Sequence, residues 1–421
     1  MSLPPLQLPV IQSWSCHNCG GCCRQHLIEI TEEERQRILK QNWTAADGIP
    51  AEQSPLVWFA GPPWKRRYRL AHRADGACVF LNEQGLCRIH AKFGEQAKPL
   101  PCQLYPYVFH PGGRKVPVSL RFSCPSVVAN KGAPVGKQLD ALKSLAAQVV
   151  PAHADTISPP PLSPRARVDW SDFYRFVEML DEIIAEPETS FVVRLVRAVS
   201  VVRTISEARF DKIQGNRLTE FLQLISGAAR SEIKEGSGID LPSRAGRLQF
   251  RMLCAHYARR DTFEDAARGW RGRVRLLRAA LTFARGSGNA APLQPGFQAV
   301  SFAALDEPFG GLNPEMESIF TRYFRVKIQG LHFCGPAYYD VPLVEGFYSL
   351  ALVFPVVVWL ARWLAASDSR TALVTDDIAR ALAIADHHHG YSPVLGSRSS
   401  RRRVRLLGHA DLERLIAWYA R

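Results

Sequence analysis

The sequence predicts a mainly α-helical protein with a small cysteine-rich, loop- and β-hairpin-containing metal-binding module at its N-terminus. Eight of the ten cysteines lie before residue 125, in a stretch rich in glycine and proline. From residue 170 onward, apolar residues recur at helical spacing, with no alternation of strands and helices. We therefore expect three parts: a cysteine-cluster module at 1–130, a Pro-rich linker at 131–168 and a helical domain at 169–421.

The module is predicted to contain one helix and several short strands. Thr31 followed by Glu34 forms a capping-box pattern, which starts a helix that should extend to about residue 41. Residues 44–66 show no period and are predicted to be a loop. Strands are expected at 68–71, 78–81 and 86–89, and Pro111-Gly112-Gly113 should join 105–110 to 115–122 as a hairpin.

The helical domain begins at Trp170 and is punctuated by Gly, Pro and Ser. Its most apolar segment is 346–361, which is shorter than the roughly 20 residues that a membrane span needs and contains Pro355. We expect a buried, kinked core helix there and no membrane span. Helices are predicted at 170–184, 190–206, 216–229, 244–258, 262–285, 313–329, 343–365, 374–387 and 408–420.

The cysteine spacing is the strongest functional signal. The first block is C-x2-C-x2-C-C, and two intervening residues let a pair of sulfurs turn toward one ion, with Gly20 and Gly21 giving the turn its freedom. Iron–sulfur clusters and structural zinc both take four such ligands, and the spacing leaves the two open. The candidate metal ligands are Cys16, Cys19, Cys22, Cys23, Cys78, Cys87, Cys102 and Cys124.

Cys22 and Cys23 are adjacent, so we expect their side chains to diverge, which favours two metal sites or one spare thiol. The first ten residues have neither a basic segment nor a long apolar run, so we expect no signal peptide and a cytoplasmic location. Thiols stay reduced there, which favours metal ligands over disulfides; in a secreted protein the same cysteines could be bridged.

Other chemically active residues fit structural roles better. His332 with Cys334, and Cys254 with His256, are predicted to be buried in helices or at their ends, and 387–389 is predicted to cap a helix. The net charge of +14 favours anionic partners. Arginines cluster at 271–278 and 401–405 with few aromatic residues among them, which makes solvated helix faces a better explanation than nucleic-acid binding.

Three motifs extend the interpretation. They are Cys16-x2-Cys19-Gly-Gly-Cys22-Cys23-Arg24, then 76–90 with Cys78 and Cys87, then Cys102-Gln-Leu-Tyr-Pro106. Together they resemble the YkgJ-type cysteine-cluster family of zinc- or iron-chelating domains, and the long chain is similar to the flagellin lysine-N-methylases of that group. This resemblance implies an iron–sulfur cluster, with 4Fe–4S favoured, and the use of S-adenosylmethionine to methylate lysines of a protein substrate, flagellin.

Two other function classes stay open at this stage. The module could be a zinc-stapled adaptor without chemistry, or the basic chain could bind nucleic acid. We identify no phosphate loop, no catalytic triad and no glycine-rich turn for a methyl-donor site, so the catalytic residues and any S-adenosylmethionine site are not located by the sequence.

Overall fold

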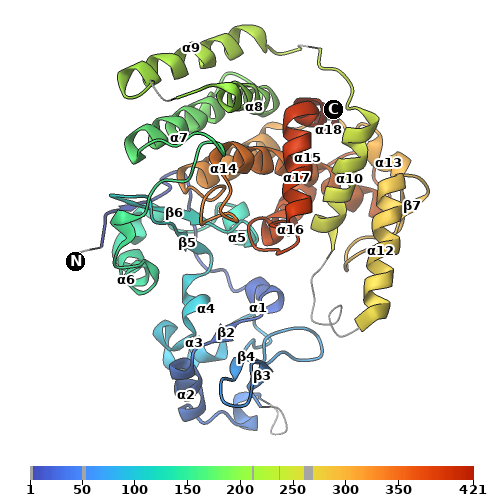
Figure 1. Cartoon of the computed structure of the whole chain (residues 1–421). Coiled ribbons are helices and arrows are strands. Elements are labelled where there is room, and N and C mark those ends of the chain that lie inside the picture. The colour runs from blue at the N-terminus through green and yellow to red at the C-terminus, as the bar shows by residue number, and fades with distance from the viewer. Residues whose placement is uncertain (1–2, 50–53, 211–212, 237, 260–268) are drawn as a thin grey trace.

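The protein has a helical body and a smaller cysteine-rich part below it in the view of Figure 1. The computed structural model describes residues 3–49, 54–210, 213–236, 238–259 and 269–421. Helices account for 53% of the chain, and the described sheets have at most three strands. The predicted fold class is therefore confirmed.

The body is organised around α15 (Leu343–Ser367), which packs against α8, α10, α16, α17 and α18. This helix is the one described helix that is long and apolar enough to cross a membrane, and its apolar window is wholly buried inside the protein. The expectation of a buried core helix that contains Pro355 is confirmed. The body consists of α7 (Trp170–Ala185), α8 (Phe191–Glu207), α9 (Asn216–Glu232), α10 (Arg244–Ala258), α12 (Gly269–Arg285), α13 (Phe302–Asp306), α14 (Pro314–Gln329), α15, α16 (Thr375–His388), α17 (Arg398–Ala410) and α18 (Leu412–Ala420).

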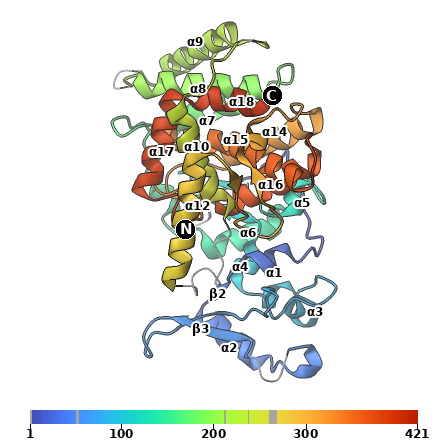
Figure 2. The same cartoon turned by 90° about the vertical axis from the view of Figure 1, so that its right-hand side faces the viewer.

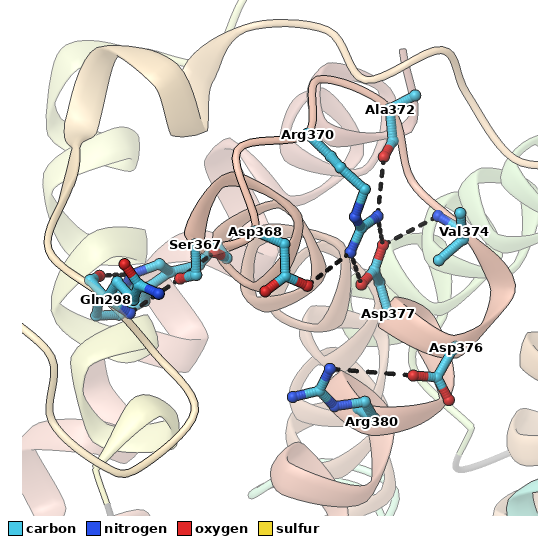
Figure 3. Close-up of polar contacts among 10 residues, drawn as sticks. Gln298, Ser367, Asp368, Arg370, Ala372, Val374, Asp376, Asp377 and Arg380 are labelled. Carbon is cyan, nitrogen blue, oxygen red and sulfur yellow. Dashed lines mark hydrogen bonds and ion pairs between the residues drawn. The ribbon is translucent and has the colours of Figure 1, made fainter.

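The turn from α15 into α16 is fixed by ionic contacts (Figure 3). Arg370 donates two hydrogen bonds of 2.7 Å to the carboxylate of Asp377, and Asp377 also accepts from the backbone N–H of Val374 at 3.0 Å. Asp377 is thus placed in the first turn of α16, where a negative charge complements the helix dipole. These contacts hold the N-terminal end of α16. At its C-terminal end, the ring of His387 lies 5.2 Å from the ring of His26 in the cysteine-rich part.

A three-stranded sheet links the two parts of the chain. β1 (Leu6–Gln7) runs parallel to β6 (Val116–Leu120), and β5 (Tyr107–Phe109) pairs with β6 antiparallel. The predicted hairpin between 105–110 and 115–122 is therefore confirmed. Val118, Leu120 and Phe122 are buried in the core of the body, so the residues between β1 and β5 leave this core and return to it.

The residues between these strands have a second, smaller core. Its buried members include Ile30, Ile38, Leu56, Leu70 and Cys78. The predicted capping box begins α2, because Glu34 N–H donates to Thr31 Oγ1 at 3.2 Å and Thr31 N–H donates to Glu34 Oε2 at 2.8 Å. The elements here are α1 (Gly21–Gln25), β2 (Glu29–Ile30), α2 (Glu32–Lys40), β3 (Leu56–Ala60), β4 (Arg67–Leu70), α3 (Arg88–Phe93) and α4 (Leu100–Leu104), with the sheet order β2-β4-β3.

Several predicted elements differ from the structure. Residues 78–81 and 86–89 are not strands: they form single bridges, and α3 begins after Cys87. The physical reason is the turn between them, where the Asn82 side chain accepts from Leu86 N–H at 2.7 Å and closes the chain before a ladder can extend. The stretch 44–66, predicted as loop, contains β3.

The region after the cysteines is also more structured than its patterning indicated. Within the stretch predicted as linker lies α6 (Leu139–Val149), preceded by the one-turn helix α5 (Pro125–Val128). The predicted helix at 408–420 corresponds to α18 and the last turn of α17, a helix whose earlier residues were not predicted; the two helices meet at Asp411. Asp411 accepts from Ser243 N–H at 2.7 Å, so a contact with α10 fixes this break. The predicted helix at 262–285 is seen from residue 269, and its first residues lie outside the described ones.

Candidate metal centre

Four separate segments bring cysteines into the small core. Cys23, Cys78, Cys87 and Cys102 all belong to it or pack against it, and Cys22 stands next to Cys23 on α1. The backbone fixes the first contact, because Cys78 N–H donates to the carbonyl of Cys23 at 2.8 Å. Five of the eight predicted ligands are thereby gathered at one place in the fold.

Cys22 and Cys23 do not diverge as expected. Their Sγ atoms lie 4.0 Å apart, because the short helix α1 lets the two side chains fold toward the same side. Gly20 makes this helix start possible: its backbone is left-handed with φ 66°, and a Cβ there would lie 3.1 Å from the Leu81 side chain. The adjacent pair can therefore contribute both of its sulfurs to one site.

Cys87 and Cys102 are positioned by helix starts. Cys87 is the residue before α3 and forms a bridge with Leu81. Cys102 lies in α4, whose N-terminus is held by the buried carboxylate of Glu34, which accepts from Leu100 N–H at 2.6 Å. The Glu34 side chain thus both closes the capping box of α2 and sets the place of Cys102.

A tight turn at residues 82–86 packs against the first cysteine block. Gly85 has φ 79°, and a Cβ at this position would lie 2.0 Å from the carbonyl oxygen of Asn18. Glycine is therefore required for the 82–86 turn to approach the first cysteine block so closely. The contact joins the loop that follows Cys78 to the loop that precedes Cys22.

The electrostatics show how closely the five thiols interact. The hydrogen bond from the Cys23 thiol lowers the pKa of Cys22 to about 7, and the same bond raises the pKa of Cys23, with further contributions from burial and from Cys78 and Cys87. Burial raises the pKa of Cys78 to about 12. It also holds that of Cys102 well above its ordinary value, and neighbouring thiols add to the effect. Clustered buried thiols resist ionisation unless a cation offsets their charges.

The other three predicted ligands are not part of the small core. Cys16 and Cys19 are exposed, and Cys19 lines a polar surface hollow of about 530 Å³ together with Arg24 and Asp75. Cys124 precedes α5, is buried in the large core and interacts electrostatically with Cys19. Across the described residues, no three or more His, Cys, Asp or Glu side chains are arranged closely enough to enclose an ion as they stand. All ten cysteines are free thiols.

The remaining cysteines and histidines behave largely as expected. Cys254 and Cys334 are buried in the core of the body, and so is His332. The helix α16 ends at His388, within the run that was predicted to cap it. His387 in addition lies 5.2 Å from the ring of His26, the residue that follows α1.

A buried polar network behind the thiols was not found by sequence reasoning. The ring of His26 lies 4.9 Å from the ring of Tyr105 and is tilted against it, and the Tyr105 hydroxyl lies 3.2 Å from Ser123 Oγ. Ser123 N–H donates to Asp386 at 2.9 Å, and Asp386 pairs with Lys327 at 2.7 Å. Desolvation, with Arg121 nearby, lowers the pKa of His26 to about 2 and keeps its ring neutral. The sequence contained one signal of this network, the acidic residue Asp386 directly before the His387–His389 run. Its buried partner, Lys327, lies 59 positions away in the sequence.

One comparison with known proteins finds a match in the cysteine-rich stretch. Residues 15–125 match the model of the CxxCxxCC family, which is described as "Putative zinc- or iron-chelating domain". No curated protein and no solved structure matches the chain. The match begins just before Cys16 and ends just after Cys124, so it spans all eight clustered cysteines. The N-terminal quarter of the chain is accordingly a cysteine-cluster segment of the zinc- or iron-chelating kind.

Proposed function

We propose that Cys22, Cys23, Cys78, Cys87 and Cys102 form a thiolate site for zinc or iron. The observation that carries this proposal is their convergence, from four segments, in one small core. The donor set fits a soft ion. In a tetrahedral site with metal–sulfur bonds of about 2.3 Å, sulfurs lie about 3.8 Å apart, and the sulfurs of Cys22 and Cys23 are 4.0 Å apart.

The residues of this chain have defined tasks in such a site. A bound metal would supply a Lewis acid or an electron carrier and would hold the four segments together. Glu34 orients the helix that carries Cys102, and the partial burial of the thiols limits the access of competing water. We assign Cys16, Cys19 and Cys124 to a second or exchangeable position, since the exposed Cys19 interacts electrostatically with the buried Cys124.

The finer proposal is an iron–sulfur centre, with 4Fe–4S favoured, in a cytoplasmic protein. Four thiolates complete such a cluster, and five are available at one place. Reduced thiols are maintained in the cytoplasm, where ligands of this kind persist. A non-catalytic zinc staple uses the same residues, and the metal itself distinguishes the two.

Metal analysis of cysteine variants tests the site. Cys78→Ser and Cys102→Ser should each lose most of the bound metal, because serine is a poor ligand for these ions. Cys254→Ser, at a buried cysteine of the body, is the matched control and should keep the wild-type metal content. Anaerobically purified protein with broad visible absorbance, iron and sulfide supports the cluster, and colourless protein with zinc supports the staple. Full metal content in both module variants would overturn the proposed ligand set.

We further propose that the centre belongs to a lysine-N-methylase-like enzyme acting on a protein such as flagellin, with S-adenosylmethionine as methyl donor. The support is the resemblance of the cysteine motifs to that branch and the buried polar network directly behind the thiols. Wild-type protein with intact metal should transfer labelled methyl groups to flagellin lysines, and Cys78→Ser should transfer none. Labelling that is unchanged in Cys78→Ser, or absent in metal-loaded wild type, would contradict this activity while leaving the metal site standing.

A further inference from the structure

The β3–β4 hairpin exposes large aromatic side chains that contribute little to the core. Trp58 is 48% exposed, Phe59 39% and Trp64 86%. Aromatic side chains of this size are mostly buried in soluble proteins, and several exposed together mark an interaction surface. We call this surface, formed by residues 57–69, the hairpin tip.

The turn that carries Trp64 is stiff. Gly61 has φ 89°, and a Cβ there would lie 2.1 Å from the carbonyl oxygen of Lys65, so the chain crosses itself closely at this point. Lys65 N–H donates to the Pro62 carbonyl at 2.9 Å, and Pro62 with Pro63 restricts the backbone further. Trp64 is therefore presented on a preorganised loop, which reduces the entropy lost when it binds a partner.

The hairpin tip is cationic. Residues 54–70 contain four basic residues and no acidic one. The guanidinium of Arg66 lies 4.7 Å from the ring centre of Trp58, and that of Arg67 lies 5.2 Å from the ring centre of Phe59. Arg67 lies opposite Ala60 at the turn end of the ladder and pairs with Glu29 at 2.5 Å, so one of the four basic residues has an acidic partner. Charge complementarity therefore points to an anionic partner.

The geometry distinguishes between anionic partners. The register shifts directly after Trp58, so alternation along β3 does not place Phe59. Alternation along β4, however, puts Tyr68 on one face and Arg67 and Arg69 on the other. Trp58 is opposite Tyr68 in the ladder, whereas Phe59 is contacted by Arg67 and Arg69. A strand of nucleic acid or an acidic peptide stacks on one face. The hairpin tip has aromatic and basic side chains on both faces. It therefore fits a lipid bilayer, which can surround the tip, better than a partner that binds one face.

We propose that the hairpin tip inserts into the surface of an anionic phospholipid bilayer. Trp64 enters the boundary between headgroups and acyl chains, where indole rings are favoured, and Lys65 and Arg66 contact lipid phosphates. The hairpin lies at the end of the molecule opposite α9 (Figures 1 and 2). In Figure 2 the hairpin extends to one side of this end, clear of the helical body and with α2 beside it.

Docking at this place also positions the thiol site. Leu56 of β3 and Leu70 of β4 are buried in the same small core as Cys78, and Leu70 N–H donates to the carbonyl of Ile28 at 2.9 Å. The hairpin is thus rigidly joined to the cysteine cluster. A bilayer that holds the tip therefore holds the five thiols close to the membrane surface.

Vesicle co-sedimentation of the full chain tests this proposal. Wild type should bind vesicles of phosphatidylcholine with phosphatidylglycerol and should not bind phosphatidylcholine alone. Lys65→Gln with Arg66→Gln should weaken binding about 30-fold, since each basic residue near an anionic surface contributes a factor of about five. Trp64→Ala should weaken it about tenfold without any change of charge. Leu224→Ala, at an exposed apolar residue of α9 on the opposite end, is the matched control and should bind like wild type.

Trp64→Ala leaves the charge unchanged, so it distinguishes insertion into the bilayer from non-specific electrostatic attraction between anionic lipid and a chain of net charge +14. Equal vesicle binding by Trp64→Ala and Leu224→Ala would overturn the proposal. So would binding of single-stranded RNA or an acidic protein that is lost in Trp64→Ala while vesicles are not bound. A blue shift of tryptophan emission on anionic vesicles, present in wild type and reduced in Trp64→Ala, supports insertion directly. All substituted side chains are exposed, so unchanged melting temperatures should accompany these results.

Discussion

Replacing Asp386 by alanine should lower the free energy of unfolding by about 3–5 kcal/mol, the largest effect that we expect for a single substitution in this protein. Asp386 and Lys327 are both fully buried, and their charged groups lie 2.7 Å apart. Without the carboxylate, the ammonium of Lys327 is left in the core with Leu120 O and His332 Nδ1, each 3.1 Å away, as neutral neighbours. Burial already lowers the pKa of Lys327, and Asp386 is the group that opposes this shift.

The loss should also reach the cysteine-rich part. Asp386 accepts from Ser123 N–H, so Asp386→Ala removes the contact that holds the chain directly before Cys124. Urea denaturation at neutral pH measures the effect. Asp376→Ala is the control on the same helix, because Asp376 is exposed and 4.0 Å from Arg380 (Figure 3), and such pairs contribute less than about 1 kcal/mol.

A double replacement separates a buried pair from its individual charges. Lys327→Met with Asp386→Leu removes both charges at once and should recover much of the stability that Asp386→Ala loses, since no ion is then left unpaired. If the double variant is less stable than Asp386→Ala, the ion pair stabilises the fold by more than the removal of an unpaired buried charge would explain. If Asp386→Ala differs from wild type no more than Asp376→Ala does, the network does not hold the two parts together.

Acidification from pH 7.5 to 5.5 should lower the free energy of unfolding by about 5 kcal/mol through four histidines whose pKa values are lowered in the folded protein, His26, His110, His332 and His389. Burial, with Lys327 nearby, lowers the pKa of His389 to about 3 and that of His332 well below its ordinary 6.5. All four rings are neutral in the folded protein, whereas the unfolded chain binds protons below pH 6.5. Stability is therefore complete above pH 6.5 and falls as the pH drops, by about 1.4 kcal/mol per unit and per histidine.

The contacts of these rings explain why they stay neutral. His389 Nδ1 lies 2.9 Å from the Tyr257 hydroxyl, and Asp386 is the acidic neighbour that partly opposes the shift. His332 lies between Lys327 and the Tyr391 hydroxyl, and His110 and Arg121 add further positive or titrating neighbours. Ionisation would place a second cation beside Lys327 inside the core.

Urea denaturation at the two pH values measures this dependence. Paired carboxylates such as Asp47 and Asp75 have pKa values lowered by their hydrogen bonds, so their contribution is lost only at more acidic pH, below about 4. His389→Gln keeps a polar side chain without a titrating ring and should lose about a quarter of the pH dependence. Release of metal from thiolates adds equally to both proteins, so the difference between them reports the histidine. An identical pH dependence in the variant would contradict this account.

Local sequence patterns determined much of the helical body. Phe173, Phe176 and Leu180 recur at helical spacing, and all are buried on α7 as expected. The capping box at Thr31 and Glu34 depends only on residues three apart, so it too could be predicted. The shortness of the apolar run 346–361 and the proline within it predicted a core helix, and the structure shows that helix buried, although at 25 residues the whole helix is long enough to span a membrane.

The small sheet and the thiol site were only partly predictable. Leu86–Ile89 has the alternation of a strand, but the Asn82 side chain and Gly85 close a turn that leaves a single bridge before α3. Short apolar runs fit a strand or a helix equally well until their neighbours are known. The cysteine spacing by itself marked residues 16–124 as a metal-binding segment. Which five thiols meet, and that Cys22 and Cys23 lie side by side, was decided by tertiary contacts such as Cys78 with Cys23.

The network behind the thiols lay beyond any local pattern. Asp386 and Lys327 are 59 positions apart, and Ser123 is 263 positions from Asp386. Their pairing depends on how α14, α16 and the end of β6 pack around one buried charge, and no periodicity in the sequence records that distance. The sequence alone determined which residues could bind a metal. The fold decided which of them meet, because a buried charge selects its partner by position in space rather than along the chain.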